Sequence, residues 1–217
     1  MTYIKFVETI ICKKRIGEPI YVHQIADELS YEFNIGSEAA LTAASVSIKR
    51  IISKHKIDNL RFYQKGIYYL CNKTPFGETP INLSKLIYDK YLSDNSGYES
   101  GPSFINKLGI TTQMPNENYI TTNRATNGKR KDKKLGVTII PPKTTITIEN
   151  KKYLQILDVL ESLSTYPIDE EYIYSIIAST ITDPSEYKTL LKIADKYYNK
   201  TTLINLAHVA NSGEQRI

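Results

Sequence analysis

The sequence predicts an α+β protein of two parts, and three observations support this fold class. Three helical patterns in the first 54 residues are followed by a short hairpin pattern over Leu60–Asn72. The middle of the chain mixes helical and strand patterns, and β-branched residues alternate in Thr144–Glu149. Apolar residues recur every three or four positions after residue 150, which indicates a helical end. We therefore expect strands within residues 81–150 and helices within 151–217.

The first part opens with three helical patterns. Apolar residues recur at helical spacing over residues 3–14 and again over 23–33. A third helix is expected to begin at Ser37, a candidate N-cap, and to end near Lys54. Its predicted inward face consists of six apolar residues: Ala40, Leu41, Ala44, Ile48, Ile51 and Ile52.

The segment LRFYQKGIYYLCN reads as two short strands joined by a tight turn at Lys65-Gly66. A hairpin after three helices is the outline of a winged helix-turn-helix, which places its third helix in the major groove of DNA. We expect this domain to cover residues 1–74. The segment 73–80, which contains two prolines and a glycine, is interpreted as a linker to a second domain over 81–217.

The placement of charge tells more than its total, because a net charge of +5 with a pI near 8.9 is only mildly basic. Short hydroxyl side chains and long cations lie on the outward face of the third predicted helix and on the hairpin. These side chains suit base edges and phosphates respectively. The candidate DNA-binding residues are Ser37, Thr42, Ser45, Lys49, Arg50, Lys54, Arg61, Gln64 and Lys65. A winged helix that makes only protein contacts is the alternative.

A second group of cations surrounds a single acid, Asp132, in the middle of the chain. Its members are Arg124, Lys129, Arg130, Lys131, Lys133 and Lys134. Two interpretations stay open for this group: a second nucleic-acid surface, or an exposed loop that is simply solvated.

No catalytic constellation is recognisable, so we expect no enzymatic activity, no cofactor and no metal. The chain lacks a P-loop and a Gly-x-Ser-x-Gly elbow, and Cys12 and Cys71 lack metal-ligand spacing. The carboxylates at 169–171 are interpreted as a solvated first helical turn. No apolar run approaches the roughly 20 residues of a membrane span, and no signal-peptide pattern is present. A cytoplasmic protein with reduced, buried thiols and no membrane contact is expected.

The segment GYESGPSFINKLGITTQMPNENYITTN, from Gly97 to Asn123, resembles the central signature of the AbiEi-type antitoxins. In that family a Ser-Gly pair opens a short helix. It is followed by Leu-Gly-Leu-Thr-Thr-Gln-x-Pro and by a strand that ends near Thr-Asn or Thr-Asp. The matching residues here are Ser100, Gly101, Leu108, Gly109, Ile110, Thr111, Thr112, Gln113, Pro115, Thr122 and Asn123.

The first part of the chain agrees with this resemblance. Ser47–Ile51 and Lys65–Tyr69 are similar to the third helix and the wing of that family, and Pro75–Gly77 is similar to its connecting segment. The resemblance covers about residues 3–150. The basic segment 127–134 is a departure from the family pattern.

The resemblance implies a repressor and antitoxin of a type IV toxin–antitoxin (abortive infection) system. The winged helix-turn-helix would bind inverted repeats in the promoter of its own operon. The C-terminal antitoxin domain, mixed α/β with a helical end, would oppose a co-encoded nucleotidyltransferase-like toxin without having to bind it. The signature itself is interpreted as a fold marker, with Gly109 ending the short helix in a left-handed conformation.

Two further functions stay open from the sequence. The runner-up is a winged-helix transcriptional regulator without a toxin partner, in which the second domain senses something else. A neighbouring nucleotidyltransferase reading frame would discriminate between the two. The third is an enzyme that acts on nucleic acid through the second basic group. That enzyme would need a metal-ligand set, which the sequence does not show.

Overall fold

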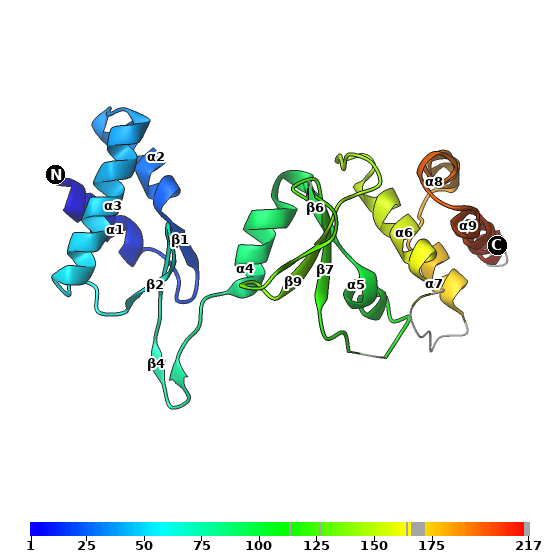
Figure 1. Ribbon diagram of the computed structural model, residues 1–217, viewed down its shortest axis with the longest axis horizontal. Coiled ribbons are helices and arrows are strands. Elements are labelled where there is room, and N and C mark those ends of the chain that lie inside the picture. Colours follow the sequence, from blue (N-terminus) through cyan, green and yellow to red (C-terminus); the bar gives the residue numbers. More distant parts are fainter. Residues whose placement is uncertain (113, 126, 164, 166–171, 215–217) are drawn as a thin grey trace. The chain divides into compact units, whose positions relative to one another are not determined.

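The computed structural model describes residues 1–112, 114–125, 127–163, 165 and 172–214 (Figure 1). The carboxylates at 169–171 lie outside the described residues. The chain divides into two compact units, Met1–Leu86 and Ile87–Ile217. Both contain helices and strands, so the fold class is mixed α+β.

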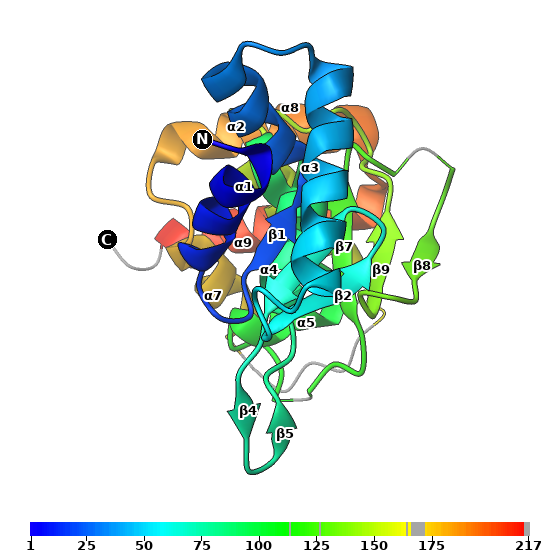
Figure 2. The same cartoon turned by 90° about the vertical axis from the view of Figure 1, so that its left-hand side faces the viewer.

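The first unit packs three helices against a small antiparallel sheet. The helices are α1 (Tyr3–Cys12), α2 (Val22–Phe33) and α3 (Ser37–Ser53). The sheet has the order β1 (Pro19–Tyr21), β3 (Ile67–Leu70), β2 (Leu60–Gln64). Figure 2 shows α3 beside α1 across the front of this unit.

One apolar core holds the first unit together, because each helix buries a stripe of apolar residues at helical spacing. The ring of Phe33 closes one end, with edge-on contacts to the rings of Tyr3 and Phe6 at 4.7 and 5.4 Å between centroids. The side chains without any exposed surface in this core are Val7, Ile11, Ile20, Leu29, Ala40, Ala44, Ile48 and Ile51.

Helix α3 departs from its expected form at both its start and its face. Gly36 is the N-cap, so Ser37 is the first helical residue rather than the cap. Leu41 and Ile52, expected in the core, are 46% and 36% exposed, whereas Ser47 is only 3% exposed. Position 47 lies on the buried stripe of the helix, whereas positions 41 and 52 lie on its flank. The place of a residue around the helix axis therefore determines its burial here more than its polarity does.

The hairpin expected after α3 is present as β2 and β3. Gly66 adopts φ +80 in the turn, a conformation that favours glycine. The pairing shifts between Phe62 and Gln64, so one residue bulges from β2. A backbone bond of 3.0 Å from Val22 to the carbonyl of Gly66 fixes the turn beside the start of α2.

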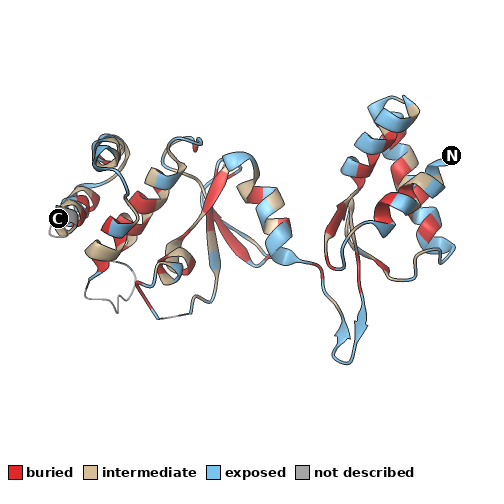
Figure 3. Cartoon of the chain, turned by 180° about the vertical axis from the view of Figure 1, so that it is seen from behind, coloured by how far each residue is buried: buried red, intermediate tan, exposed pale blue. Residues whose placement is uncertain are grey.

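The segment 73–80, expected to be a linker, contains a second hairpin. Its strands are β4 (Lys73–Thr74) and β5 (Gly77–Glu78), which pair antiparallel. The Thr74 hydroxyl donates to the Gly77 carbonyl at 2.7 Å and accepts from the backbone of Phe76 at 3.3 Å. Figure 3 shows the whole hairpin as exposed.

The second unit contains a four-stranded mixed sheet. β6 is antiparallel to β7, β7 is parallel to β9, and β9 is antiparallel to β8. In the order of the sheet, the strands are β6 (Gly97–Ser100), β7 (Asn118–Thr122), β9 (Val137–Ile140) and β8 (Arg130–Asp132).

Helices flank this sheet and form the C-terminal part. A π-helical turn, η1 (Tyr88–Leu92), directly follows α4, and a 3-10 turn, η2 (Ser93–Asn95), follows it. Helix α4 (Leu83–Ile87) lies at the boundary of the two units. The α-helices of the second unit are α5 (Gly101–Lys107), α6 (Lys151–Ser162), α7 (Ile173–Ser179), α8 (Pro184–Tyr197) and α9 (Lys200–Glu214). The capping box expected at the start of α8 is confirmed, with Asp183 as N-cap and Glu186 reaching back.

The clearest strand predicted from the sequence, Thr144–Glu149, is wrong. This segment is an irregular connection in which Ile146 alone is buried. The Asn123 amide donates to the Ile146 carbonyl at 2.9 Å and accepts from its N–H at 2.8 Å. The Asn150 amide likewise binds the backbone on either side of Ile146. It donates to the Thr145 carbonyl at 2.9 Å and accepts from the Thr147 N–H at 2.8 Å. Side-chain amides therefore satisfy the groups that a neighbouring strand would otherwise pair.

Two other findings concern the chain as a whole. Within the described residues, no helix combines the length and the apolar character that crossing a membrane requires. Cys12 and Cys71 are both free thiols, and Cys12 is exposed, contrary to the expectation that both would be buried.

Candidate nucleic-acid interface

Four of the nine expected contact residues share the outward face of α3. Thr42, Lys49 and Arg50 are exposed and Ser45 is half-buried. Residues three, four or seven positions apart lie on one side of a helix, and Arg50 sits at the edge of that side. The face therefore presents hydroxyl groups and cations together, which is the chemistry that base edges and phosphates require.

Charge is distributed unevenly along α3. Glu38 lies in the first turn, where the helix dipole favours an acid, and the cations lie in the second half. Lys54, also exposed, is the C-cap, and its N–H donates to the Arg50 carbonyl at 3.1 Å. Phosphate contacts are therefore expected along the C-terminal half of α3 rather than at its start.

The hairpin contributes fewer free cations than the sequence indicated. The Arg61 guanidinium binds both oxygens of Glu78, at 2.9 Å from Nε and 2.5 Å from Nη2, and also the Asp58 carbonyl at 2.7 Å. The hydrogen bond with Glu78 raises the pKa of Arg61, and the same bond lowers the pKa of the Glu78 carboxyl. Arg61 therefore ties the β4–β5 hairpin to β2. Lys65 stays exposed at its turn, with Gln64 half-buried beside it.

The second basic group is divided by its contacts. Arg124 donates to the backbone carbonyls of Asp89, at 3.3 Å, and Lys90, and so closes the end of η1. Lys131 pairs with Glu117, and the Lys129 ammonium lies 4.9 Å from the centre of the Tyr119 ring. These three cations have internal roles, so the sequence cluster is not one uniform surface.

The rest of the second basic group lies on and after β8. Arg130, Lys133 and Lys134 are exposed. Asp132 accepts from the Lys90 ammonium at 2.7 Å and from the Tyr91 hydroxyl at 2.8 Å. Burial works against the charged form, but these bonds outweigh it and lower the pKa of Asp132. The segment expected as a loop thus includes a short strand anchored by its acid.

The signature residues make internal contacts. The Thr122 hydroxyl donates to the Tyr91 carbonyl at 2.9 Å, beside the end of η1. Gly101 has φ +63, and a Cβ there would lie 3.1 Å from the Tyr119 ring. Gly109 has φ +74 directly after α5, as expected for the left-handed end of that helix. Gln113 lies outside the described residues.

A buried carboxyl cluster in the second unit is absent from the sequence expectations. Asp158 on α6 accepts from the Tyr98 hydroxyl at 2.8 Å, the Tyr198 hydroxyl at 2.7 Å and the Thr121 hydroxyl at 3.4 Å. Burial raises the pKa of the Asp158 carboxyl, and the bonds from the tyrosines only partly oppose this rise. Burial likewise raises the pKa of both tyrosine hydroxyls.

The signal that could have revealed Asp158 is its place on the buried side of α6, one turn after Leu154 and next to Leu157. Both leucines have no exposed surface, so the half-buried Asp158 places its carboxylate against the core of the second unit. The cluster joins β6, β7, α6 and the end of α8. Its enclosure makes it a structural group rather than a site for a substrate.

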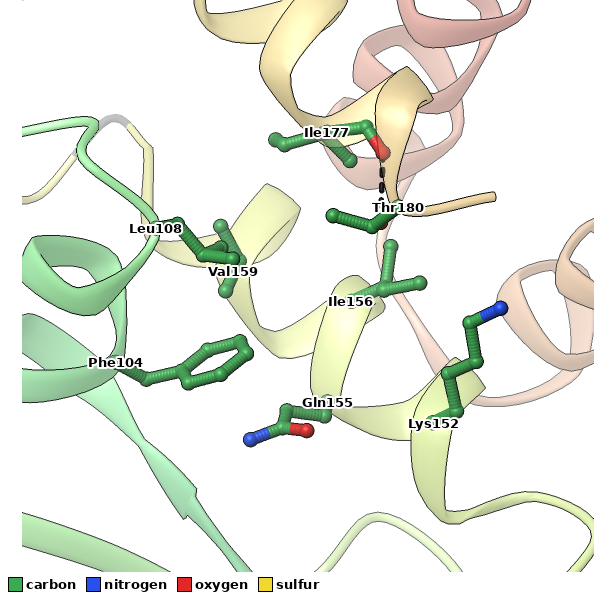
Figure 4. Close-up of a pocket in the computed structure, with 8 residues that line it drawn as sticks. All are labelled: Phe104, Leu108, Lys152, Gln155, Ile156, Val159, Ile177 and Thr180. Carbon is green, nitrogen blue, oxygen red and sulfur yellow. Dashed lines mark hydrogen bonds between the residues drawn. The ribbon is translucent and has the colours of Figure 1, made fainter. Parts of the chain in front are cut away.

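A small apolar cavity of about 80 Å³ lies between α5, α6 and α7 (Figure 4). Its polar side chains are already bonded within the protein: Thr180 donates to the Ile177 carbonyl at 2.7 Å, Gln155 to the Glu99 carbonyl at 2.8 Å, and Lys152 pairs with Glu186. The lining residues are Phe104, Leu108, Lys152, Gln155, Ile156, Val159, Ile177 and Thr180. Convergent polar groups, which a specific ligand site needs, are missing from this part of the described structure.

The described residues contain no group of three or more His, Cys, Asp or Glu side chains placed to hold a metal ion. The outward face of α3 is therefore the surface whose chemistry points most directly to a partner. Comparison with known proteins adds no relative, because no family model, curated protein or solved structure matches the chain.

Proposed function

We propose that the first unit is a winged helix-turn-helix that binds double-stranded DNA, and that the protein represses transcription of its own operon. The observation that carries this proposal is the outward face of α3, where Thr42, Ser45, Lys49 and Arg50 combine hydroxyl groups with cations. No role in the core of the first unit accounts for the two cations.

The order of elements supports the same reading. Three helices with β1 between the first two are followed by the β2–β3 hairpin, which is the arrangement of a winged helix. In this proposal α3 enters the major groove, Thr42 and Ser45 approach base edges, and Lys49, Arg50 and Lys54 hold phosphates. Lys65 extends the contact from the turn of the hairpin.

We further propose that the protein is the antitoxin of a type IV system and opposes a nucleotidyltransferase-like toxin encoded beside it. The support is the resemblance over Gly97–Asn123. Direct contact with the toxin is not required. If no nucleotidyltransferase reading frame lies beside the gene, the antitoxin part falls and a winged-helix regulator remains.

The first experiment measures binding of the full chain to the DNA upstream of its own gene and to a scrambled duplex, across a salt series. We expect preference for the upstream DNA and an affinity that falls steeply with salt, because bound phosphates release counterions. Each lost phosphate contact lowers the slope of log affinity against log salt by about one. The Lys49→Ala/Arg50→Ala variant should therefore bind weakly, with a slope lower by about two.

The matched control is Lys188→Ala/Lys192→Ala, which removes the same charge from exposed positions on α8. It should keep the wild-type affinity and slope. Equal weak binding to both duplexes would leave only a basic surface, and would argue for a winged helix that contacts protein.

A further inference from the structure

Three small apolar groups form a stripe along the outward face of α3. Ala39, Thr42 and Val46 follow one another at spacings of three and four residues, and Lys49 continues the line. Ala39 and Thr42 are exposed, and Val46 is 38% exposed. The stripe occupies the middle of the face that carries the cations.

The apolar core of the first unit does not include this stripe. Val46 and Thr42 are β-branched, and such residues are less favourable in a helix than alanine, because the preceding turn restricts their side chains. Val46 is absent from the apolar core that holds α1, α2 and α3 together. Thr42 and the exposed part of Val46 therefore leave apolar surface on this face that the core of the first unit does not cover.

The hydroxyl of Thr42 is already bonded within the helix. It donates to the carbonyl of Glu38, one turn earlier, at 3.0 Å. The hydroxyl hydrogen is therefore used within the helix, and what remains for an outside partner is the methyl group and the acceptor capacity of the oxygen. Together with the side chains of Ala39 and Val46, Thr42 presents methyl groups rather than hydrogen-bond donors.

We propose that this stripe recognises thymine methyl groups in the major groove of the operator. This inference rests on the proposed function and adds the base that the helix selects. The thymine methyl is the apolar group on the major-groove edge of a base pair, and alanine and threonine methyl groups contact it in protein–DNA complexes. Lys49 and Arg50 hold the phosphates beside the groove and so keep the stripe against the bases.

The length of the stripe limits how many bases it reads. From Ala39 to Val46 the helix rises by about 10 Å, at ~1.5 Å per residue. Base pairs are stacked ~3.4 Å apart, so the stripe spans roughly three of them at most. Each half-site should therefore contain one or two thymines whose methyl groups matter.

The test replaces each thymine of the upstream duplex, one at a time, with deoxyuridine. This change removes one methyl group and keeps the base pairing. With the full-length protein, we expect at least one replacement in each half-site to weaken binding about fourfold, the factor expected for one buried methyl group. Replacements outside the half-sites should have no effect.

The partner of the critical thymine is identified with the Val46→Ala variant. The ratio of affinities for thymine and uracil at that position should fall from about four to about one, because the contacting methyl groups are gone. Leu41→Ala is the matched control, since Leu41 is exposed on the same helix but lies on its flank. That variant should keep the wild-type ratio.

The outcomes separate the two proposals. Preference for the upstream duplex without any effect of uracil overturns thymine recognition and leaves the repressor intact. A critical thymine whose effect survives both in Val46→Ala and in Thr42→Ser, which removes the methyl group and keeps the hydroxyl, also overturns the stripe as its reader. No preference for the upstream duplex at all overturns both proposals together.

Discussion

At the scale of single residues, Asp158 shows how burial and hydrogen bonding oppose each other. Three hydroxyl groups reach its two oxygens, which favours the charged carboxylate. Burial favours the neutral acid and prevails, so the pKa of Asp158 lies above its ordinary value. The nearby charge of Glu161 also raises this pKa, and Lys143, which pairs with Glu161 at 2.9 Å, opposes it.

This raised pKa gives Asp158 an unusual effect on the pH dependence of stability. A group that binds its proton more tightly when folded contributes stability at low pH, and the contribution is lost as pH rises through the folded pKa. We expect the free energy of unfolding of the wild type, relative to an Asp158→Asn variant, to decline as pH rises above about 3.9, the pKa of an unperturbed Asp. The slope cannot exceed about 1.4 kcal/mol per pH unit.

Denaturant unfolding at a series of pH values measures this difference, and Asp132→Asn is its control. The folded pKa of Asp132 is lowered, so its contribution is present above the unfolded pKa and is lost as pH falls. The two variants should therefore give differences of opposite sign against pH. The same sign for both would show that Asp158 is not protonated more readily in the folded chain.

At the scale of secondary-structure elements, local periodicity identified the helices of the first unit, helix α6 and the β2–β3 hairpin. The stripes of α1, α2 and α6 lie where apolar spacing predicts them, because a helix buries one face whatever its partner is. The hairpin of β2 and β3 follows from its Lys65-Gly66 turn. These features depend on residues that are close together in the sequence.

Features that depend on distant residues were not predictable in this way. Thr144–Glu149 alternates like a strand, but Asn123 occupies its backbone groups from more than 20 residues away. In the sequence Arg61 is indistinguishable from an unpaired cation, because its partner Glu78 lies 17 residues later in the chain. The sequence was therefore enough to locate the helix of the candidate interface and its cations. It was not enough to show which cations are paired with a carboxylate of the same chain.

The β4–β5 hairpin leads to a prediction about Arg61. Because its guanidinium is held by Glu78 and the Asp58 carbonyl, we expect Arg61→Ala to leave the salt dependence of DNA binding unchanged. Lys49→Ala, which removes an exposed cation of α3, should lower the slope of log affinity against log salt by about one. Fluorescence anisotropy across a salt series measures both slopes. A decrease of about one for Arg61→Ala would show that the arginine leaves Glu78 to bind phosphate.

At the scale of the whole molecule, each unit has its own apolar core. The first core draws on α1, α2, α3 and the small sheet, and the main core of the second draws on α5 to α9. A substitution in one core should therefore leave the packing of the other unchanged. Leu157, which has no exposed surface, is a suitable probe of the second core, because truncating a buried leucine to alanine costs about 2–5 kcal/mol.

If the proposed function is right, separate cores predict that repression and protection from the proposed toxin can be lost one at a time. Lys49→Ala/Arg50→Ala alters only the exposed face of α3, so we expect it to lose repression of its own promoter and to keep protecting cells from the toxin. Leu157→Ala weakens the second unit, so it should lose protection and keep binding upstream DNA. A promoter–reporter assay and growth during co-expression with the neighbouring nucleotidyltransferase measure the two activities. Loss of both activities in Leu157→Ala would show that repression depends on the second unit as well. Loss of both in Lys49→Ala/Arg50→Ala would show that protection depends on the first unit.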